Sequence, residues 1–289
     1  FVNSSTDLDF TYGDGEDAVD TGSTISATVA IDATSAPVAG TYNFRDVAFA
    51  TSPGNGFSVG RIYFVDADGA VGGGDGSGSD ASNPMTLAAA EAAIAAGDII
   101  VLINNGDVIT TAATNANDTL NLLDDVQLLS FGDGAGGSQT IAVNITAPPT
   151  FLLSAAGIVI NDPTGNGAAT LTTSAGNDVV TLGSTGNRLS GLILEGNGTA
   201  TRGIVDSGGA TGTTITRSIV RNFANYGIEI TPSTNTTIDG VTFSGNTGDV
   251  LLNAANSTLR NITSTGSGVN GSITLNDTTG TTTLENISI

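Results

Sequence analysis

The feature that most constrains this chain is an apolar residue that recurs about every 21 to 26 residues through its C-terminal half. Each copy stands in a short segment rich in Thr and Asn, and a second short apolar segment follows it. The recurring residues are Leu189, Ile215, Ile238, Leu259 and Leu284. A period of this length is typical of solenoid proteins, in which each repeat packs mainly on its two neighbours.

The residue types within each repeat distinguish between two kinds of solenoid. A leucine-rich repeat needs a Leu-rich consensus and usually a helix, whereas these units consist of Thr, Asn, Gly and β-branched residues. In a parallel β-helix each coil is a rung of short strands, and its inward residues stack about 4.8 Å from those of the next coil. The sequence therefore predicts an all-β parallel β-helix.

Short apolar segments of the same kind extend toward the N-terminus with less regular spacing. We expect about eight coils between residues 98 and 289, because one rung takes about 23 residues, and we expect further coils beyond a chain that we interpret as a fragment. The earlier segments assigned to coils are residues 128–131, 151–153, 158–160, 169–171 and 179–182.

One helix is predicted, and it stands directly before the first coil. Asn83 is the expected N-cap and Pro84 the first helical residue of an alanine-rich stretch, residues 85–96, that Gly97 ends. The apolar run 98–103 follows as the first rung. Such a helix is expected to cover the strand edges that the end of a solenoid exposes.

The order of these elements carries a family resemblance. A strand (61–65), a loop rich in Asp and Gly (66–80), the helix and the sequence Gly97-Asp98-Ile-Ile-Val are similar to the entry of right-handed parallel β-helix domains of the pectate-lyase-like superfold. The likeness is greatest to large bacterial cell-surface and autotransporter-like proteins, and it covers residues 60–289. It implies a right-handed rod in an extracellular or cell-surface protein, with or without enzymatic activity.

The predicted organisation therefore has three parts: residues 1–60, 61–97 and 98–289. Residues 61–97 form the entry with the capping helix, and residues 98–289 form the coils. Residues 1–60 alternate like short strands joined by Gly and Asp turns. This N-terminal β region is expected to be a small module, a set of strands added to the entry, or an arm that pairs with a neighbouring molecule.

Composition excludes several function classes. The chain has no Lys, His or Cys, and all seven basic residues are arginines against 28 acids, which gives a net charge of -21. Catalysis through His, Cys or Lys is excluded, as is a zinc site of the usual ligands. Nucleic acid is not expected as a partner, because a strongly acidic chain is repelled by phosphates. No apolar run is long enough for a membrane span, and membrane insertion is not expected.

The remaining catalytic possibility is a polysaccharide lyase with an arginine base, as the resemblance implies for enzymatic members. Arg217 and Arg221 stand four residues apart, and their nearest acids in the sequence are Asp206 and Glu229. We favour the interpretation that these arginines balance an acidic surface. Carboxylate pairs such as Glu195 with Asp239, or Asp239 with Glu285, would need a particular register to lie within catalytic distance.

A calcium site is a second possibility. Four carboxylates stand in the glycine-rich loop at Asp66, Asp68, Asp75 and Asp80. Ca²⁺ takes carboxylate and carbonyl oxygens of this kind, although the glutamate that closes an EF-hand loop is missing and Asp-Gly loops also form simply as turns.

A sugar contact is predicted at Arg221, Phe223 and Tyr226, which place two aromatic rings beside a guanidinium. The Asn-x-Ser/Thr sequences at Asn197, Asn256, Asn261 and Asn286 are interpreted as turn asparagines. An ice-binding face is not favoured, because the spacing of the threonines drifts between coils.

The sequence thus favours a non-enzymatic structural rod of an extracellular adhesin or surface filament, with end-to-end or lateral self-association or a surface ligand as its partner. The alternative is a carbohydrate-binding or lyase-like polysaccharide-cleaving β-helix. No cofactor is required in either case, apart from the possible Ca²⁺.

Overall fold

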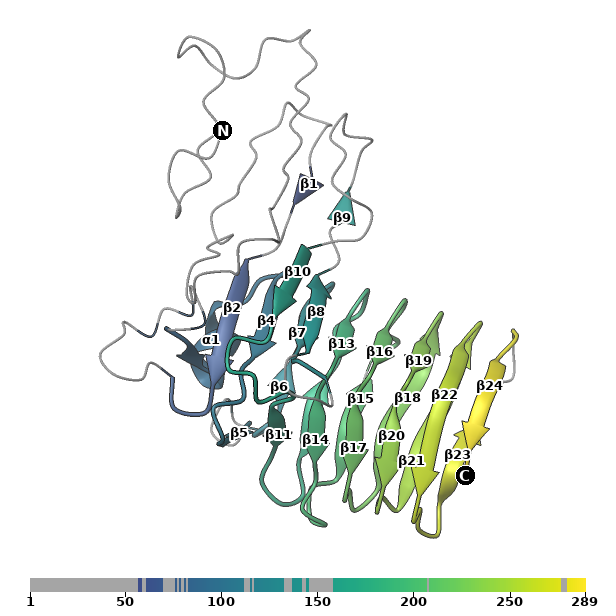
Figure 1. Ribbon diagram of the computed structural model, residues 1–289. Coiled ribbons are helices and arrows are strands. Elements are labelled where there is room, and N and C mark those ends of the chain that lie inside the picture. Colours follow the sequence, from purple (N-terminus) through teal and green to yellow (C-terminus); the bar gives the residue numbers. More distant parts are fainter. Residues whose placement is uncertain are drawn as a thin grey trace, which may run out of the picture.

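A computed structural model of the chain describes residues 57–58, 61–69, 76, 78, 81, 83–111, 115, 117–132, 137–141, 144–145, 158–206, 208–276 and 280–289. Within these residues the chain winds into a parallel β-solenoid of about eight turns (Figure 1). A complete turn has three short strands, one on each of three faces that we call A, B and C in chain order. The predicted all-β solenoid of the right-handed type is confirmed.

Face A is the longest stack and runs through every turn. Its strands pair in parallel with the strand of the next turn. In order they are β2 (Ile62–Asp66), β4 (Ile99–Leu102), β7 (Gln127–Leu129), β13 (Arg188–Ser190), β16 (Thr214–Thr216), β19 (Thr237–Asp239), the first part of β22 (Thr258–Thr265) and β24 (Thr283–Ser288).

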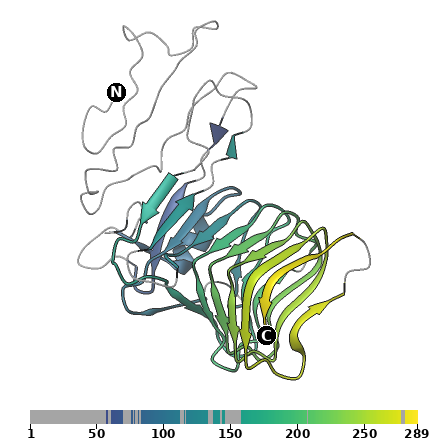
Figure 2. The same cartoon turned by 45° about the vertical axis from the view of Figure 1, so that its right-hand side comes forward.

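Faces B and C complete the turns (Figure 2), and β22 bends round the corner so that its second part belongs to face B. Face B contains β5 (Val108–Thr110), β11 (Thr170–Thr172), β14 (Ile193–Glu195), β17 (Ile219–Arg221) and β20 (Thr242–Ser244) before that part of β22. Face C contains β6 (Leu120–Asn121), β12 (Asp178–Thr181), β15 (Arg202–Asp206), β18 (Tyr226–Thr234), β21 (Gly248–Ala255) and β23 (Gly271–Leu275).

The recurring apolar residues of the sequence lie opposite one another on face A. Leu189, Ile215, Ile238 and Leu259 pair in register and are completely buried. Leu284 continues the row in the last described turn, where its side chain is 49% exposed. The periodicity of the sequence therefore predicted both the register and the inward side of these strands.

The corners between faces A and B are built from residues with a left-handed backbone. In three turns the corner residue directly follows a face A strand, and in the last two it lies within β22 or β24, where the strand bends toward face B. The residue after each corner residue turns inward. The corner residues are Gly191, Arg217, Gly240, Asn261 and Asn286, with φ between 48° and 70°. Gly and Asn adopt this conformation most readily, which explains their abundance in the chain. The predicted turn positions of Asn197, Asn256, Asn261 and Asn286 are confirmed by their positive φ.

One segment leaves the solenoid between faces A and B of the third turn. Strands β8 (Ser138–Ile141) and β10 (Ile158–Asn161) form an antiparallel pair there. Strand β9 (Asn144–Ile145) pairs antiparallel with β1 (Phe57–Ser58). The prediction that residues 158–160 form a coil is therefore wrong, because a run of three apolar residues fits an antiparallel strand pair as well as a rung. Residues 151–153 lie outside the described residues.

A second apolar cluster covers the outside of face A in the first three turns. It contains Ile62, Phe64, Ile99, Val101, Ile103, Leu129 and Phe131, and Ile160 of β10 packs against it. These strands are buried on both sides, which agrees with the uninterrupted apolar run at residues 98–103. That run is not the first rung, since β2 precedes it on face A.

The single helix of the described residues is shorter than expected. Helix α1 (Leu87–Ala93) begins after Thr86, whose Oγ1 accepts the N–H of Ala89 at 3.3 Å. Asn83 is not its N-cap, because β3 (Met85–Thr86) pairs with the end of β2 and holds these residues extended. Leu87 and Ala90 face the solenoid core. No helix among the described residues is long and apolar enough to cross a membrane.

The predicted N-terminal β region lies almost entirely outside the described residues. Only Phe57–Ser58 is described, and it pairs with β9 of the same chain. The capping role of α1 and the boundaries at residues 60 and 97 stay predictions.

Candidate functional site

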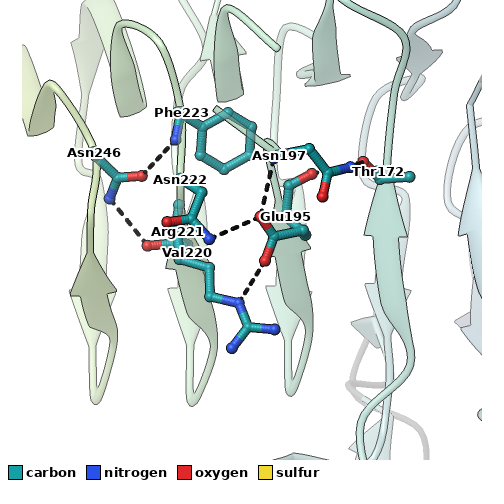
Figure 3. A network of polar contacts seen from close by, with 8 residues as sticks. All are labelled: Thr172, Glu195, Asn197, Val220, Arg221, Asn222, Phe223 and Asn246. Atoms are coloured by element: carbon teal, nitrogen blue, oxygen red, sulfur yellow. Dashed lines mark hydrogen bonds and ion pairs between the residues drawn. The ribbon is translucent and has the colours of Figure 1, made fainter. Parts of the chain in front are cut away.

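Two opposite charges meet in the middle of face B, on neighbouring turns (Figure 3). Glu195 at the end of β14 and Arg221 at the end of β17 are register partners, and Arg221 Nε lies 2.6 Å from Glu195 Oε2. Asn222 Nδ2 and the backbone N–H of Asn197 each donate to Glu195 Oε1 at 2.9 Å. The carboxylate is thus held by three donors from two turns.

This environment fixes the charge of Glu195. Burial alone would raise its pKa, but the hydrogen bonds from Asn222 and Asn197 and the charge of Arg221 together hold the pKa below its ordinary value. An ionised carboxylate with this many donors is a poor general acid and a weak base. The geometry therefore suits a stable charged pair rather than proton transfer.

The structure does not bring the three residues of the predicted sugar contact together on one surface. The Arg221 side chain is 42% exposed and the Tyr226 side chain is partly exposed on face C, but Phe223 is only 1% exposed and belongs to the core. The prediction of a surface role for Phe223 is wrong. Because Phe223 is the second residue of the corner between faces B and C, its side chain points inward, as Asn246 does one turn later.

Glycines make room for the buried ring. A Cβ added at Gly203 would lie 2.5 Å from the carbonyl oxygen of Gly227 and 3.1 Å from the ring of Phe223, and one at Gly196 would lie 2.7 Å from the same ring. The backbone N–H of Phe223 donates to Asn246 Oδ1 at 3.0 Å (Figure 3). The aromatic residue is therefore part of the stacking between turns.

The proposed calcium ligands are only partly described. Asp66 is 2% exposed, and its Oδ1 accepts the N–H groups of Asp68 and Gly69 while its Oδ2 accepts Asn105 Nδ2 at 2.6 Å. The carboxylate of Asp66 thus closes the loop itself. Asp75 and Asp80 lie outside the described residues. In the part of the chain that the structure describes, no three acidic side chains gather to hold a metal ion.

The other arginine ion pairs also join neighbouring turns. Arg202 on face C binds Asp178 of the preceding turn and Glu229 of the following turn. Arg260 on face A binds Asp239 at 2.8 Å. Asp178 raises the pKa of Arg202, although burial opposes it. These contacts support the interpretation that arginines balance the acidic surface.

The carboxylate pairs considered from the sequence are not assembled for catalysis. Glu195 is on face B and Asp239 is on face A, two turns away. Asp239 and Glu285 do share an outward row, but Arg260 is the register partner of both and stands between them. Burial raises the pKa of Asp239, but bonds from Asn261 and Arg260 outweigh it and hold the pKa below its ordinary value.

A buried polar cluster inside the last turns was not predicted. Asp249 is completely buried, and its carboxylate accepts Asn246 Nδ2 at 2.9 Å and the hydroxyls of Ser264 and Ser267. At the corner between faces B and C, the inward residue is Phe223 in one turn, Asn246 in the next and Ser267 in the one after. An Asn-x-x-Asp sequence in a turn was the only available signal, and it is common in this chain.

Comparison of the chain with protein-family models, with curated proteins and with solved structures found no match. The likeness to bacterial β-helix domains thus depends on the residues of the entry segment alone.

Proposed function

We propose that this chain is a non-enzymatic structural rod of an extracellular protein, either a surface adhesin or a surface filament. The proposal rests on one observation: the ion-paired arginines link neighbouring turns. Arg202, Arg221 and Arg260 each bind a carboxylate of an adjacent turn. Charged groups that in an enzyme would converge on one site are instead distributed along the axis on all three faces.

The rod geometry supports a mechanical role. Parallel turns whose register on face A is unbroken from β13 to β24 give a stiff element whose length grows with each repeat. The outward side of face A changes from apolar in the first three turns to polar in the later ones, where Thr214, Thr237, Thr258 and Thr283 form one row. The later turns therefore present a hydrated surface.

Self-association is the partner that we favour, either end to end or laterally. The last described turn leaves Leu284 49% and Ile289 76% exposed. A further coil, of this chain or of a second molecule, would cover them by continuing the parallel pairing. An extracellular location is part of the same proposal. The proposal includes neither nucleic acid as a partner nor insertion of this segment into a membrane.

Electron microscopy of the purified chain and of the native assembly tests this function. We expect isolated or end-joined rods whose width is that of one solenoid, and filaments with an axial repeat of one subunit if the chain polymerises. Compact, non-elongated particles would contradict the proposal.

The second candidate is a carbohydrate-binding or polysaccharide-cleaving β-helix. The regular outward surface of face B favours it, because one row holds Val108, Thr170, Ile193, Ile219, Thr242 and Thr263 in register. Arg221 on face B and Tyr226 on the adjoining face C remain as polar and aromatic contacts. A panel of neutral and uronate polysaccharides, assayed for binding and for cleavage with and without Ca²⁺, separates this candidate from the rod.

Calcium binding in the loop 66–80 remains a proposal of its own. Its support is the density of carboxylates, with Asp68 next to the closed turn of Asp66. A melting temperature that is the same in excess Ca²⁺ and in EDTA would contradict the calcium proposal.

A further inference from the structure

One corner inside the solenoid is polar in four consecutive turns. The corner joins face C to face A, and in each of these turns it contains a residue with positive φ, either Gly or Asn. The residue after it lies inside the solenoid, is at most 1% exposed and carries a hydroxyl or an amide. These buried residues, which we call the polar row, are Asn187, Thr213, Thr236 and Ser257. A polar group in such a place needs a hydrogen-bond partner, because burial has removed its contact with solvent.

Backbone hydrogen bonds show which members of the polar row are neighbours. The N–H of Thr214 donates to the carbonyl of Asn187 at 2.9 Å, and the N–H of Thr237 donates to the carbonyl of Thr213 at 2.8 Å. Strands β13 and β16, which directly follow Asn187 and Thr213, pair in register. Asn187 and Thr213 therefore stack on adjacent turns, about 4.8 Å apart along the axis.

Both of these neighbours have a side-chain oxygen without a partner. Among the described residues three buried side-chain oxygens make no hydrogen bond, and two of the three are Asn187 Oδ1 and Thr213 Oγ1. The amide of Asn187 is oriented by its nitrogen, because Nδ2 donates to the carbonyls of Leu123 at 2.7 Å and Val126 at 3.3 Å. A flipped amide would turn its oxygen toward those carbonyls. Unpaired buried oxygens destabilise a fold, so two of them on adjacent turns indicate a shared partner.

The following turn shows what Thr213 lacks. There Ser233 Oγ lies 2.9 Å from the hydroxyl of Thr236, three residues later in the chain. The equivalent of Ser233 in the turn of Thr213 is Ala210, since the residues that follow these two form a parallel bridge. Ala210 is completely buried and has no hydroxyl. The partner of Thr213 Oγ1 therefore has to come from outside the chain.

We propose that an internal water molecule binds between Asn187 and Thr213 and connects their two turns. The water donates one hydrogen bond to Asn187 Oδ1 and makes a second with Thr213 Oγ1, which can donate or accept. Buried waters of proteins make about two to four such bonds to groups that are otherwise unpaired. Water fits better than a cation, because the polar row consists of neutral groups that offer no counter-charge. The proposal does not depend on the rod function.

A crystal structure of the whole chain at high resolution tests this site directly. We expect a density peak about 2.7 to 2.8 Å from both Asn187 Oδ1 and Thr213 Oγ1. In solution, the amide protons of these two residues should show nuclear Overhauser effects to a water molecule that stays bound for longer than the chain takes to tumble. Direct contact between the two oxygens with no peak between them would overturn the proposal. So would an anomalous peak at the site in crystals grown with a rubidium salt, because it would identify a cation.

Two variants of Thr213 separate a bridging water from an unpaired hydroxyl. Thr213→Val removes the hydroxyl at nearly constant volume. We expect it to lose the peak and the Overhauser effects, and to melt about 2 °C or more below the parent, because Asn187 Oδ1 is left without a partner. A melting temperature equal to or above that of the parent would overturn the proposal, since the loss of an unpaired hydroxyl is stabilising. Thr213→Ser keeps the hydroxyl and should keep both water signals, and their loss in this variant would contradict the site.

The matched control is Thr236→Val. It removes a hydroxyl of the same row that already has a partner in Ser233, so the water signals at Asn187 should stay as they are in the parent. Their loss in Thr236→Val would show that the water does not depend on Asn187 and Thr213 alone, and would contradict the proposed pair. The parent and Thr213→Ser decide the proposal if a valine variant does not fold.

Discussion

The guanidinium of Arg202 forms a two-pronged ion pair with Asp178, the residue opposite it on the preceding turn. Arg202 Nε lies 2.9 Å from Oδ1 and Nη2 lies 2.7 Å from Oδ2, while Nη1 contacts Glu229 of the following turn at 3.0 Å. One side chain therefore connects three turns of face C. The three side chains are only 18% to 27% exposed, so water screens the pairs less than it screens ordinary surface pairs.

Arg202→Gln is expected to lower the free energy of unfolding by about 1 to 2 kcal/mol, since it leaves two half-buried carboxylates without a cation. Arg202→Lys keeps the charge but cannot form the two-pronged contact with Asp178, so its free energy of unfolding should lie between those of Arg202→Gln and the parent. Urea unfolding followed by circular dichroism measures both. The matched control is Arg260→Gln, whose pair is more exposed and should contribute less than about 0.5 kcal/mol. Equal losses for Arg202→Gln and Arg260→Gln would contradict the link between three turns.

Glu195 and Asp239 make the fold sensitive to acid. Their pKa values in the folded chain lie below the ordinary values of 4.5 and 3.8, so the unfolded chain binds more protons in this range. Stability from these groups is complete above the ordinary values and is lost as the pH falls through the folded ones. The melting temperature should therefore decrease as the pH is lowered below about 4.5. In Glu195→Gln the acid slope should be shallower than in the parent, and an unchanged slope would remove Glu195 as a contributor.

The periodic part of the fold follows from the sequence because one residue type is selected at each inward position. The spacing of Leu189, Ile215, Ile238 and Leu259 predicts that they stack, and the structure places them in one buried row. The pairing of charged side chains could not be predicted in the same way. Arg221 pairs with Glu195, 26 residues earlier, because adjacent turns and not adjacent residues decide which outward groups meet.

The departures from the repeat were hidden for a related reason. The short apolar run of β10 suits an antiparallel strand pair and a rung equally, and only its partner β8 decides between them. The start of α1 was misplaced because Met85 forms a strand pair with Val65, and this tertiary pairing prevailed over helix signals at Asn83 and Pro84. Phe223 was assigned to the surface because the corner residue before it, Asn222, reverses the side on which the next side chain lies.

Gly203 is expected to tolerate no side chain, because the ring of Phe223 and the backbone of the next turn occupy the space. A methyl group in Gly203→Ala would lie 2.5 Å from the carbonyl oxygen of Gly227, and the displaced backbone should cost about 1 to 3 kcal/mol. Gly208→Ala is the control, since nothing lies within 4 Å of its Cβ and the change should stay within about 0.5 kcal/mol. Thermal and urea unfolding measure both variants. A stable Gly203→Ala would show that the turns can separate at this point.

The left-handed corner at Arg217 gives the last prediction. An alanine there keeps the unfavourable backbone and loses the contact with Gln139, whereas a glycine loses the same contact but adopts φ 48° freely. Arg217→Gly should therefore be more stable than Arg217→Ala by about 1 kcal/mol, although glycine normally loses more entropy on folding than alanine does. Urea unfolding of the two variants side by side measures this difference. The control is the same comparison at Thr216, which is in a strand with an ordinary backbone, where alanine should be the more stable. If alanine were also favoured at Arg217, the corner would not be strained.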